Sequence, residues 1–125
     1  MNQETLLDDI YERQLIKFPD QTPEQTRRKL KAEIFELQEA RRAYYYGGGS
    51  LEEVKSEEAD VIIMANRLWR DDNDPMAWMI LDSMYNYETA KWVKAKWEIV
   101  EKRIYKKDSE GTYQHIELNY GASNG

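Results

Sequence analysis

Two pairs of acidic residues stand one helical turn apart in segments that are otherwise rich in apolar residues. Glu33 and Glu36 lie within AEIFELQEA, and Glu57 and Asp60 lie within SEEADVIIM. Residues i and i+3 of a helix project from the same side, so each pair presents two carboxylates together. Carboxylates crowded into a small volume repel one another and resist losing water, and a hard divalent cation relieves both effects. The spacing therefore indicates a site for Mg²⁺ or Mn²⁺, completed by water or phosphate oxygens.

Either pair alone has an ordinary explanation, because acidic residues at this spacing most often lie on a solvated helix face. Two pairs that flank one turn, each beside an apolar stripe, favour a shared site instead. On a helical wheel Glu58 lies nearer the apolar stripe than Asp60 does. The wheel alone leaves open which of these two side chains reaches a cation.

Helical periodicity through most of the chain gives the acidic pairs their positions. Helices are expected at about residues 6–18, 23–45, 51–70 and 75–107, the last in one piece or two. Residues 108–118 are expected to form a turn and a short extended segment. Thr22 and Gln25 predict a cap for the second helix, the glycines at 47–49 end it, and Ser50 predicts the next cap. Short connections between helices predict an all-α, four-to-five-helix bundle, with the two acidic helices paired as an antiparallel hairpin.

Composition limits the classes of protein that fit. The chain has 125 residues, a formal net charge of −6 and no cysteine. We expect one domain over residues 1–118 and a flexible tail at 119–125. Disulfides and thiolate sites are excluded, and the acidic balance argues against a stable nucleic-acid complex. Neither a signal peptide nor a membrane-length apolar run is apparent, so we expect a cytoplasmic protein that does not bind membranes.

Three sequence blocks, in this order, resemble the MazG-like all-α nucleotide pyrophosphohydrolases. The blocks are KFPDQTPEQTRRKLKAEIFELQEA, EEADVIIMANRL and KWEIVEKRIYKKDSEGTYQHI, and the resemblance spans about residues 11–116. The last block is similar to the ending of small phage and bacterial members of the dATP/dGTP pyrophosphohydrolase type, MazZ-like. The chain departs from the family pattern at Ala32, where a glutamate is frequent, and at Val100, where some members have asparagine.

The resemblance implies a metal site and a reaction. Glu33, Glu36, Glu57 and Asp60 would be the Mg²⁺ ligands, so the family pattern favours Asp60 over Glu58. The reaction would be hydrolysis of a nucleoside triphosphate to a monophosphate and diphosphate, with Glu33 or Glu36 as the base that activates water. Purine deoxynucleotides, dGTP or dATP, are the expected substrates, and control of a phage nucleotide pool is the expected setting, in the host cytoplasm if the chain is phage-encoded.

Several other side chains are candidates for substrate binding. The basic face of the fourth helical stretch would hold the outgoing phosphates through Lys94, Lys96 and Arg103, although a solvated lysine face explains it equally well. Lys17 and Phe18 are candidates by resemblance. Asn66 lies six residues after Asp60 and either touches the base or supports a helix contact. The lone histidine, His115, is expected to be structural.

Two further hypotheses remain open at this stage. A dUTPase-like enzyme or a phosphoribosyl-ATP pyrophosphohydrolase would use the same metal chemistry on a different base. A helical interaction module with solvated acidic pairs would show no response to metal ions. Apolar surface on the third and fourth helical stretches exceeds what a four-helix monomer needs. We therefore expect a homo-oligomer, a dimer or a tetramer, with basic residues that act across the subunit contact.

Overall fold

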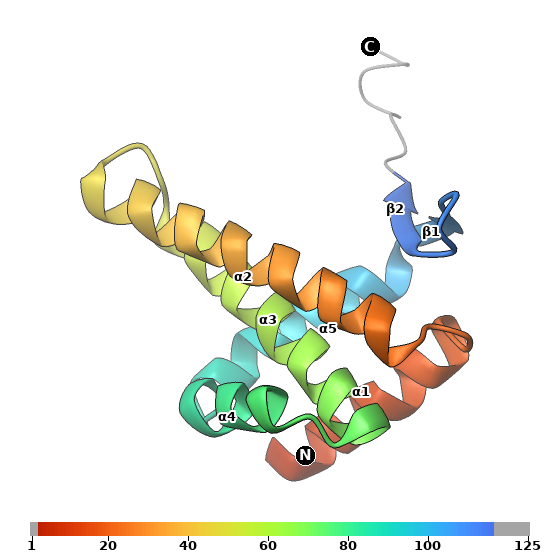
Figure 1. The fold of residues 1–125 in the computed structure, drawn as a ribbon. Helices are drawn as coiled ribbons and strands as arrows, with labels where there is room; N and C mark the ends of the chain where they lie inside the picture. Colours follow the sequence, from red (N-terminus) through yellow and green to blue (C-terminus); the bar gives the residue numbers. More distant parts are fainter. Residues whose placement is uncertain (1–2, 117–125) are drawn as a thin grey trace.

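Five helices and a two-stranded hairpin form the computed structural model, which describes residues 3–116 (Figure 1). The elements are α1 (Gln3–Lys17), α2 (Pro23–Tyr46), α3 (Leu51–Asp72), α4 (Pro75–Met84), α5 (Thr89–Lys102), β1 (Ile104–Lys107) and β2 (Tyr113–Ile116). The predicted all-α class is confirmed, with a small antiparallel hairpin added. None of the described helices combines the length and the apolar character that crossing a membrane requires. The predicted tail at 119–125 lies outside the described residues.

Side-chain caps fix where the two acidic helices begin. The Thr22 backbone N–H donates to the Gln25 side chain (2.9 Å), and the Gln25 N–H donates to the Thr22 hydroxyl (3.2 Å). At the start of α3, the Ser50 hydroxyl accepts from the Glu53 N–H (3.1 Å). In the connection between the helices, a Cβ atom at Gly49 would lie 2.8 Å from the backbone of α2. The predicted caps are therefore confirmed. They fix the residue at which each helix begins, and so which residues of α2 and α3 lie opposite each other in the hairpin.

Helix α3 is the central element, as its nearly continuous apolar surface predicts. It packs most extensively against α2 and also contacts α5, α4 and α1. Its side chains between Ala59 and Leu68 are almost all buried, and Ala59, Ile62 and Ala65 are completely so. Figure 1 shows α2 and α3 as a long hairpin, with α4 and α5 packed beside α3. This packing brings the acidic segments of α2 and α3 next to each other.

One buried side chain of α3 is charged and fully satisfied. Arg67 is 1% exposed, and its Nε lies 2.5 Å from a carboxylate oxygen of Asp71. Its other nitrogens donate to the backbone carbonyls of Gln14 (3.3 Å), Phe18 (3.2 Å) and Gln21 (3.2 Å). Arg67 therefore ties the end of α1 and the connection that follows it to the core, because its guanidinium donates to backbone carbonyls of both segments.

The prediction of helix as far as residue 107 is wrong. Helix α5 ends at Lys102, the backbone of Arg103 is extended, and β1 follows at once. Strand β1 pairs antiparallel with β2, with Tyr105 opposite His115. The Tyr105 ring packs edge-on against Phe18 at 4.8 Å, and Tyr113 lies 5.0 Å from the same ring. Pairing with β2 and packing on Phe18 override the local helical spacing. The extended segment expected after residue 108 is confirmed as β2.

Candidate metal centre

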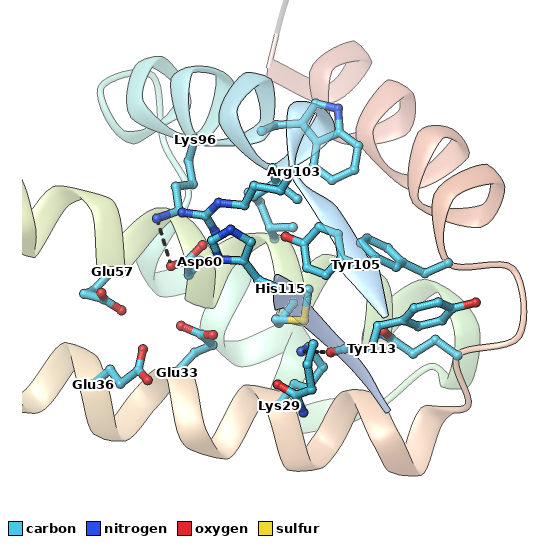
Figure 2. Close-up of a pocket in the computed structure, with 17 residues that line it drawn as sticks. Lys29, Glu33, Glu36, Glu57, Asp60, Lys96, Arg103, Tyr105, Tyr113 and His115 are labelled. Carbon is cyan, nitrogen blue, oxygen red and sulfur yellow. Dashed lines mark hydrogen bonds and ion pairs between the residues drawn. The ribbon is translucent and has the colours of Figure 1, made fainter. Parts of the chain in front are cut away.

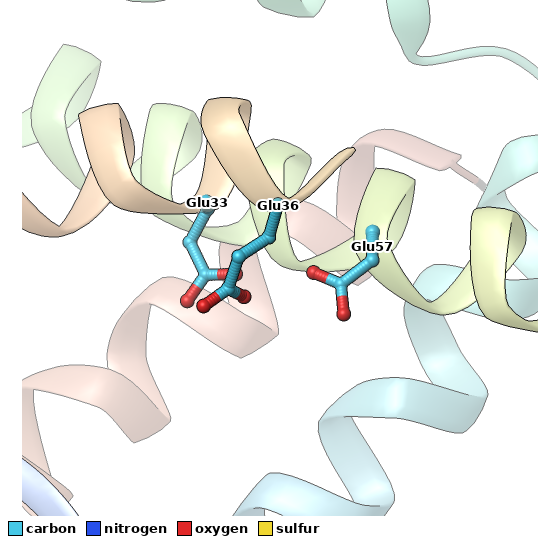
Figure 3. Close-up of side chains that lie close together, drawn as sticks. All are labelled: Glu33, Glu36 and Glu57. Atoms are coloured by element: carbon cyan, nitrogen blue, oxygen red, sulfur yellow. The ribbon is translucent and has the colours of Figure 1, made fainter. Parts of the chain in front are cut away.

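Three carboxylates from two helices converge at one point of the α2–α3 hairpin (Figure 3). Glu33 and Glu36 project from adjacent turns of α2, and Glu57 projects toward them from the second turn of α3. One oxygen of each residue can be chosen such that all three lie within 4.8 Å of one another. The sequence prediction that the acidic pairs meet is therefore correct for these three residues.

Asp60 lies in the same pocket but in a different electrostatic setting. It lines the pocket together with the three glutamates, and one of its oxygens lies 3.2 Å from the ammonium of Lys96. It is not part of the close group of three. Glu58 faces Arg41 at 3.6 Å and does not line the pocket. Of the two side chains that the helical wheel left open, Asp60 is the one directed to the site.

Burial and mutual repulsion raise the pKa values of these carboxyl groups. Burial raises the pKa of Glu33 to about 8, and the charges of Asp60 and Glu36 add to the shift. The pKa of Glu57 rises to about 7 for the same two reasons, burial being the larger. Burial also raises the pKa of Asp60, although Lys96 opposes the shift. Without a cation, the folded protein therefore holds these carboxylates at a substantial electrostatic penalty.

Unpartnered oxygen atoms show that the residues present suit a divalent cation. Oε2 of Glu33 and Oε2 of Glu57 are buried and have no hydrogen-bond partner within the part of the chain that the structure describes. Buried carboxylate oxygens normally have partners, because desolvation without compensation is unfavourable. Carboxylate oxygens are the ligands that Mg²⁺ and Mn²⁺ prefer. Glu33, Glu36 and Glu57 could thus hold the ion, with Asp60 beside them.

The carboxylates form one wall of a pocket of about 350 Å³ (Figure 2). Lys96 and Arg103, at the opposite side of the carboxylates from α2, supply positive charge. Lys96 is buried and donates to the Ser56 hydroxyl at 2.7 Å as well as pairing with Asp60. The β-hairpin closes a further side with aromatic rings. This volume falls in the range of small-molecule sites, and its charges match a polyanion bound with a cation.

The other predicted substrate-binding residues divide into two groups. Phe18, Lys96 and Arg103 line the pocket, as expected for binding residues. Lys17 does not, because its ammonium donates to the Glu101 carbonyl at 3.0 Å. Lys94 is exposed outside the pocket. Asn66 is buried, donates to the Leu7 carbonyl at 3.1 Å and accepts from Arg70, so its contacts are those of a helix support.

Sequence reasoning missed several residues of the pocket wall. Those with polar groups are Gln21, Lys29, Tyr105, Tyr113 and Gln114, and the wall also includes the apolar residues Ile63, Met64 and Val100 and the ring of Trp97. His115, expected to be structural, also lines the pocket, and its ring lies 5.9 Å from that of Tyr105. Only Lys29 had a usable signal, because it precedes Glu33 by four residues on the same helix and so shares its face. The hairpin residues reach the site through a strand pairing that no local pattern specifies.

The chain was compared with known proteins in three ways. A scan against protein-family models, a search of curated proteins and a search of solved structures each find no match. The resemblance to the MazG-like enzymes therefore stays a prediction from the sequence blocks.

Proposed function

We propose that the protein is a Mg²⁺- or Mn²⁺-dependent nucleoside triphosphate pyrophosphohydrolase, which converts a (d)NTP and water to a (d)NMP and diphosphate. The observation that carries this proposal is the convergence of Glu33, Glu36 and Glu57 in a pocket that also contains Lys96 and Arg103. Carboxylates alone suit a cation, and ammonium or guanidinium groups alone suit an anion. Both together suit a polyphosphate that arrives with a divalent cation.

The roles of the residues follow from their charges and positions. Glu33, Glu36 and Glu57 would hold the cation, which when bound neutralises charge on the phosphates and makes water a better nucleophile. Glu33 or Glu36 would accept the proton of the attacking water. Asp60 keeps Lys96 in place through their ion pair.

The reaction balances with these groups alone. The water oxygen forms a bond to the α-phosphorus, and the bond from that phosphorus to the oxygen bridging the α- and β-phosphates breaks. The proton of the water passes to the carboxylate base. Lys96 and Arg103 would stabilise the negative charge on the departing diphosphate, and the Arg103 guanidinium can bind two phosphate oxygens at once.

The nucleobase of the proposed substrate is inferred mainly from the sequence resemblance. Purine deoxynucleotides, dGTP or dATP, and a role in a phage nucleotide pool follow from the sequence resemblance. The rings of Tyr105 and His115 on the pocket wall support a flat base as part of the ligand. dUTP and phosphoribosyl-ATP are the alternative substrates, and both would be cleaved by the same chemistry.

A chromatographic product assay tests the proposal. Purified protein is given each ribo- and deoxynucleoside triphosphate, dUTP and phosphoribosyl-ATP in turn, with Mg²⁺ or Mn²⁺. We expect a monophosphate and diphosphate without a nucleoside diphosphate intermediate, and the fastest reaction identifies the base. Absence of turnover for every substrate with either metal would refute the proposal. The helical interaction module would then be the better description, provided that metal ions also leave the melting temperature unchanged.

A further inference from the structure

Lys29 is a positively charged residue of the pocket to which the sequence assigned no role. It lies on α2, four residues before Glu33, and lines the same pocket as the carboxylates. Figure 2 shows it on α2 beside Glu33, with Lys96 and Arg103 on the opposite side of the site. Cations therefore flank the acidic group from two directions, and only those of α5 and its C-terminal end were expected from the sequence.

The hydrogen bonding of Lys29 leaves donors available. Its ammonium donates to the Tyr113 backbone carbonyl at 2.9 Å. Among residues 3–116 it has no other hydrogen-bond partner and forms no ion pair within 4.0 Å. A lysine ammonium carries three donors, so two remain. Burial lowers the pKa of Lys29, and the charge of Glu33 opposes this shift, so an anion bound beside it would further favour the charged form.

We propose that Lys29 binds the phosphate group that stays on the nucleoside, whereas Lys96 binds the diphosphate that leaves. This inference rests on the proposed function. It states which lysine binds each end of the triphosphate. Lys29 is bonded to the strand that carries Tyr113 and His115, so it lies at the aromatic end of the pocket. Lys96 contacts Ser56 and Asp60 on α3. If the nucleobase lies against the aromatic rings, the phosphate attached to its sugar is the phosphate nearest Lys29.

A purely structural role for Lys29 is the alternative that the experiment must separate. The hairpin is held at a second place by Asp20, which accepts from the Tyr113 hydroxyl and pairs with Lys107. Asp20 does not line the pocket. Asp20→Ala therefore loosens the hairpin without removing a charge from the site. If Lys29 only anchors the hairpin, Lys29→Met and Asp20→Ala will have the same effects on ligand binding.

The test is calorimetric titration of the whole chain in Mn²⁺ with dGMP, dAMP, dCMP, dUMP and pyrophosphate. Lys29→Met should weaken the tightest monophosphate about 10- to 100-fold, as expected for a lost hydrogen bond to a charged group. The affinity of Lys29→Met for pyrophosphate should differ from that of the wild type by less than about threefold, as expected when a substitution does not touch the ligand. Lys96→Met should show the reverse pattern, and Lys29→Arg should retain monophosphate binding. Asp20→Ala should speed hydrogen exchange in residues 104–107 and 113–116 while keeping monophosphate affinity.

A measurement on the unmodified protein covers the case in which Lys29→Met fails to fold. The carbon-13 resonance of the Lys29 Cε should move on titration with the monophosphate and stay in place with pyrophosphate. Equal monophosphate affinity in wild type and Lys29→Met overturns the inference, as does an unmoved resonance. If the wild type hydrolyses a triphosphate in such a case, the proposed function stands. A wild type that neither hydrolyses nor binds any of these compounds overturns both.

Discussion

Two charged clusters that involve helix α3 differ in whether their buried polar atoms have partners. Near its C-terminal end, Arg67 is surrounded by the Asp71 carboxylate and three backbone carbonyls. Near its N-terminal end, Glu57 meets Glu33 and Glu36, and two buried oxygens there have no partner in the described residues. The same helix therefore contributes to one cluster whose buried polar atoms have partners and to another in which two buried oxygens have none.

The difference separates a structural site from a candidate functional one. A buried charge whose hydrogen bonds are complete requires nothing from outside the chain, and its removal leaves other groups without partners. A buried group of like charges with unpartnered oxygens is unfavourable by itself and favourable only with a cation. The comparison predicts that changes at Arg67 act on stability and that changes at the glutamates act on ligand binding and turnover.

The largest effect is expected at Glu36, where Glu36→Gln should lower kcat/KM roughly 10²- to 10⁴-fold if it serves as base or ligand. The free energy of unfolding without metal should stay the same or rise, because one of the repelling charges is gone. Glu39→Gln is the matched control, since Glu39 lies one turn further along α2 and pairs with Arg42 at the surface. The product assay and a urea titration report the two quantities. Full activity of Glu36→Gln contradicts the assignment of the site.

The opposite pattern is expected for Arg67→Met. Removing the guanidinium takes the ion-pair partner from Asp71 and a donor from each of three buried carbonyls, and the free energy of unfolding should fall by about 3–5 kcal/mol. Arg41→Met removes a more exposed cation that faces Glu58 and should cost less than about 1 kcal/mol. Urea unfolding followed by circular dichroism measures both. Equal losses in the free energy of unfolding for Arg67→Met and Arg41→Met would show that the buried ion pair contributes no more to stability than the exposed one.

Metal ions should act on the glutamate cluster and leave the Arg67 cluster unaffected. Mg²⁺ or Mn²⁺ at ten times its dissociation constant should stabilise the folded state by about 1.4 kcal/mol, seen as a rise in melting temperature. Glu33→Gln should remove most of this rise. Arg67→Met should keep it, although its starting temperature is lower. A metal response that survives Glu33→Gln places the ion elsewhere in the molecule.

The last effect is expected from pH in the absence of metal. Folding raises the pKa of Glu33 from 4.5 to about 8 and that of Glu57 from 4.5 to about 7. Between pH 4.5 and these values the folded state binds more protons than the unfolded state, so this part of the stability is lost as pH rises. The melting temperature should therefore fall from pH 5 to pH 8.5 in a chelator, and less steeply in Glu33→Gln. A flat profile in the wild type argues against burial of these charges.

Local signals explain why much of the fold was predictable. Thr22 with Gln25, and Ser50 after the glycines, specify helix starts through contacts three residues apart, and the structure has those contacts. The i, i+3 spacing of Glu33 and Glu36 likewise fixes their common side of α2. Such features depend on neighbours in sequence, so a single sequence contains them.

What could not be predicted depends on neighbours in space. The residues of β1 keep a helical spacing with those of α5, and only their pairing with β2 and the packing of Tyr105 on Phe18 make them a strand. The presence of Lys29 in the pocket wall depends on the same hairpin. The sequence analysis assigned no role to Arg67. Its burial depends on the Gln14 and Phe18 carbonyls, which lie about fifty residues away in the sequence.

The two ways in which the pocket walls are attached have a kinetic consequence. The carboxylates stand on α2 and α3, the most extensively packed pair of helices, so they separate from one another only when the core itself unfolds. The hairpin wall is held by the packing of Tyr105 and Tyr113 on Phe18 and by hydrogen bonds from a few side chains, among them those with Asp20, Gln25 and Lys29. We expect it to separate at a lower free energy than the α2–α3 pair. A ligand in the pocket could then exchange on the hairpin side many times during the lifetime of one folded molecule, while the acidic wall keeps its geometry.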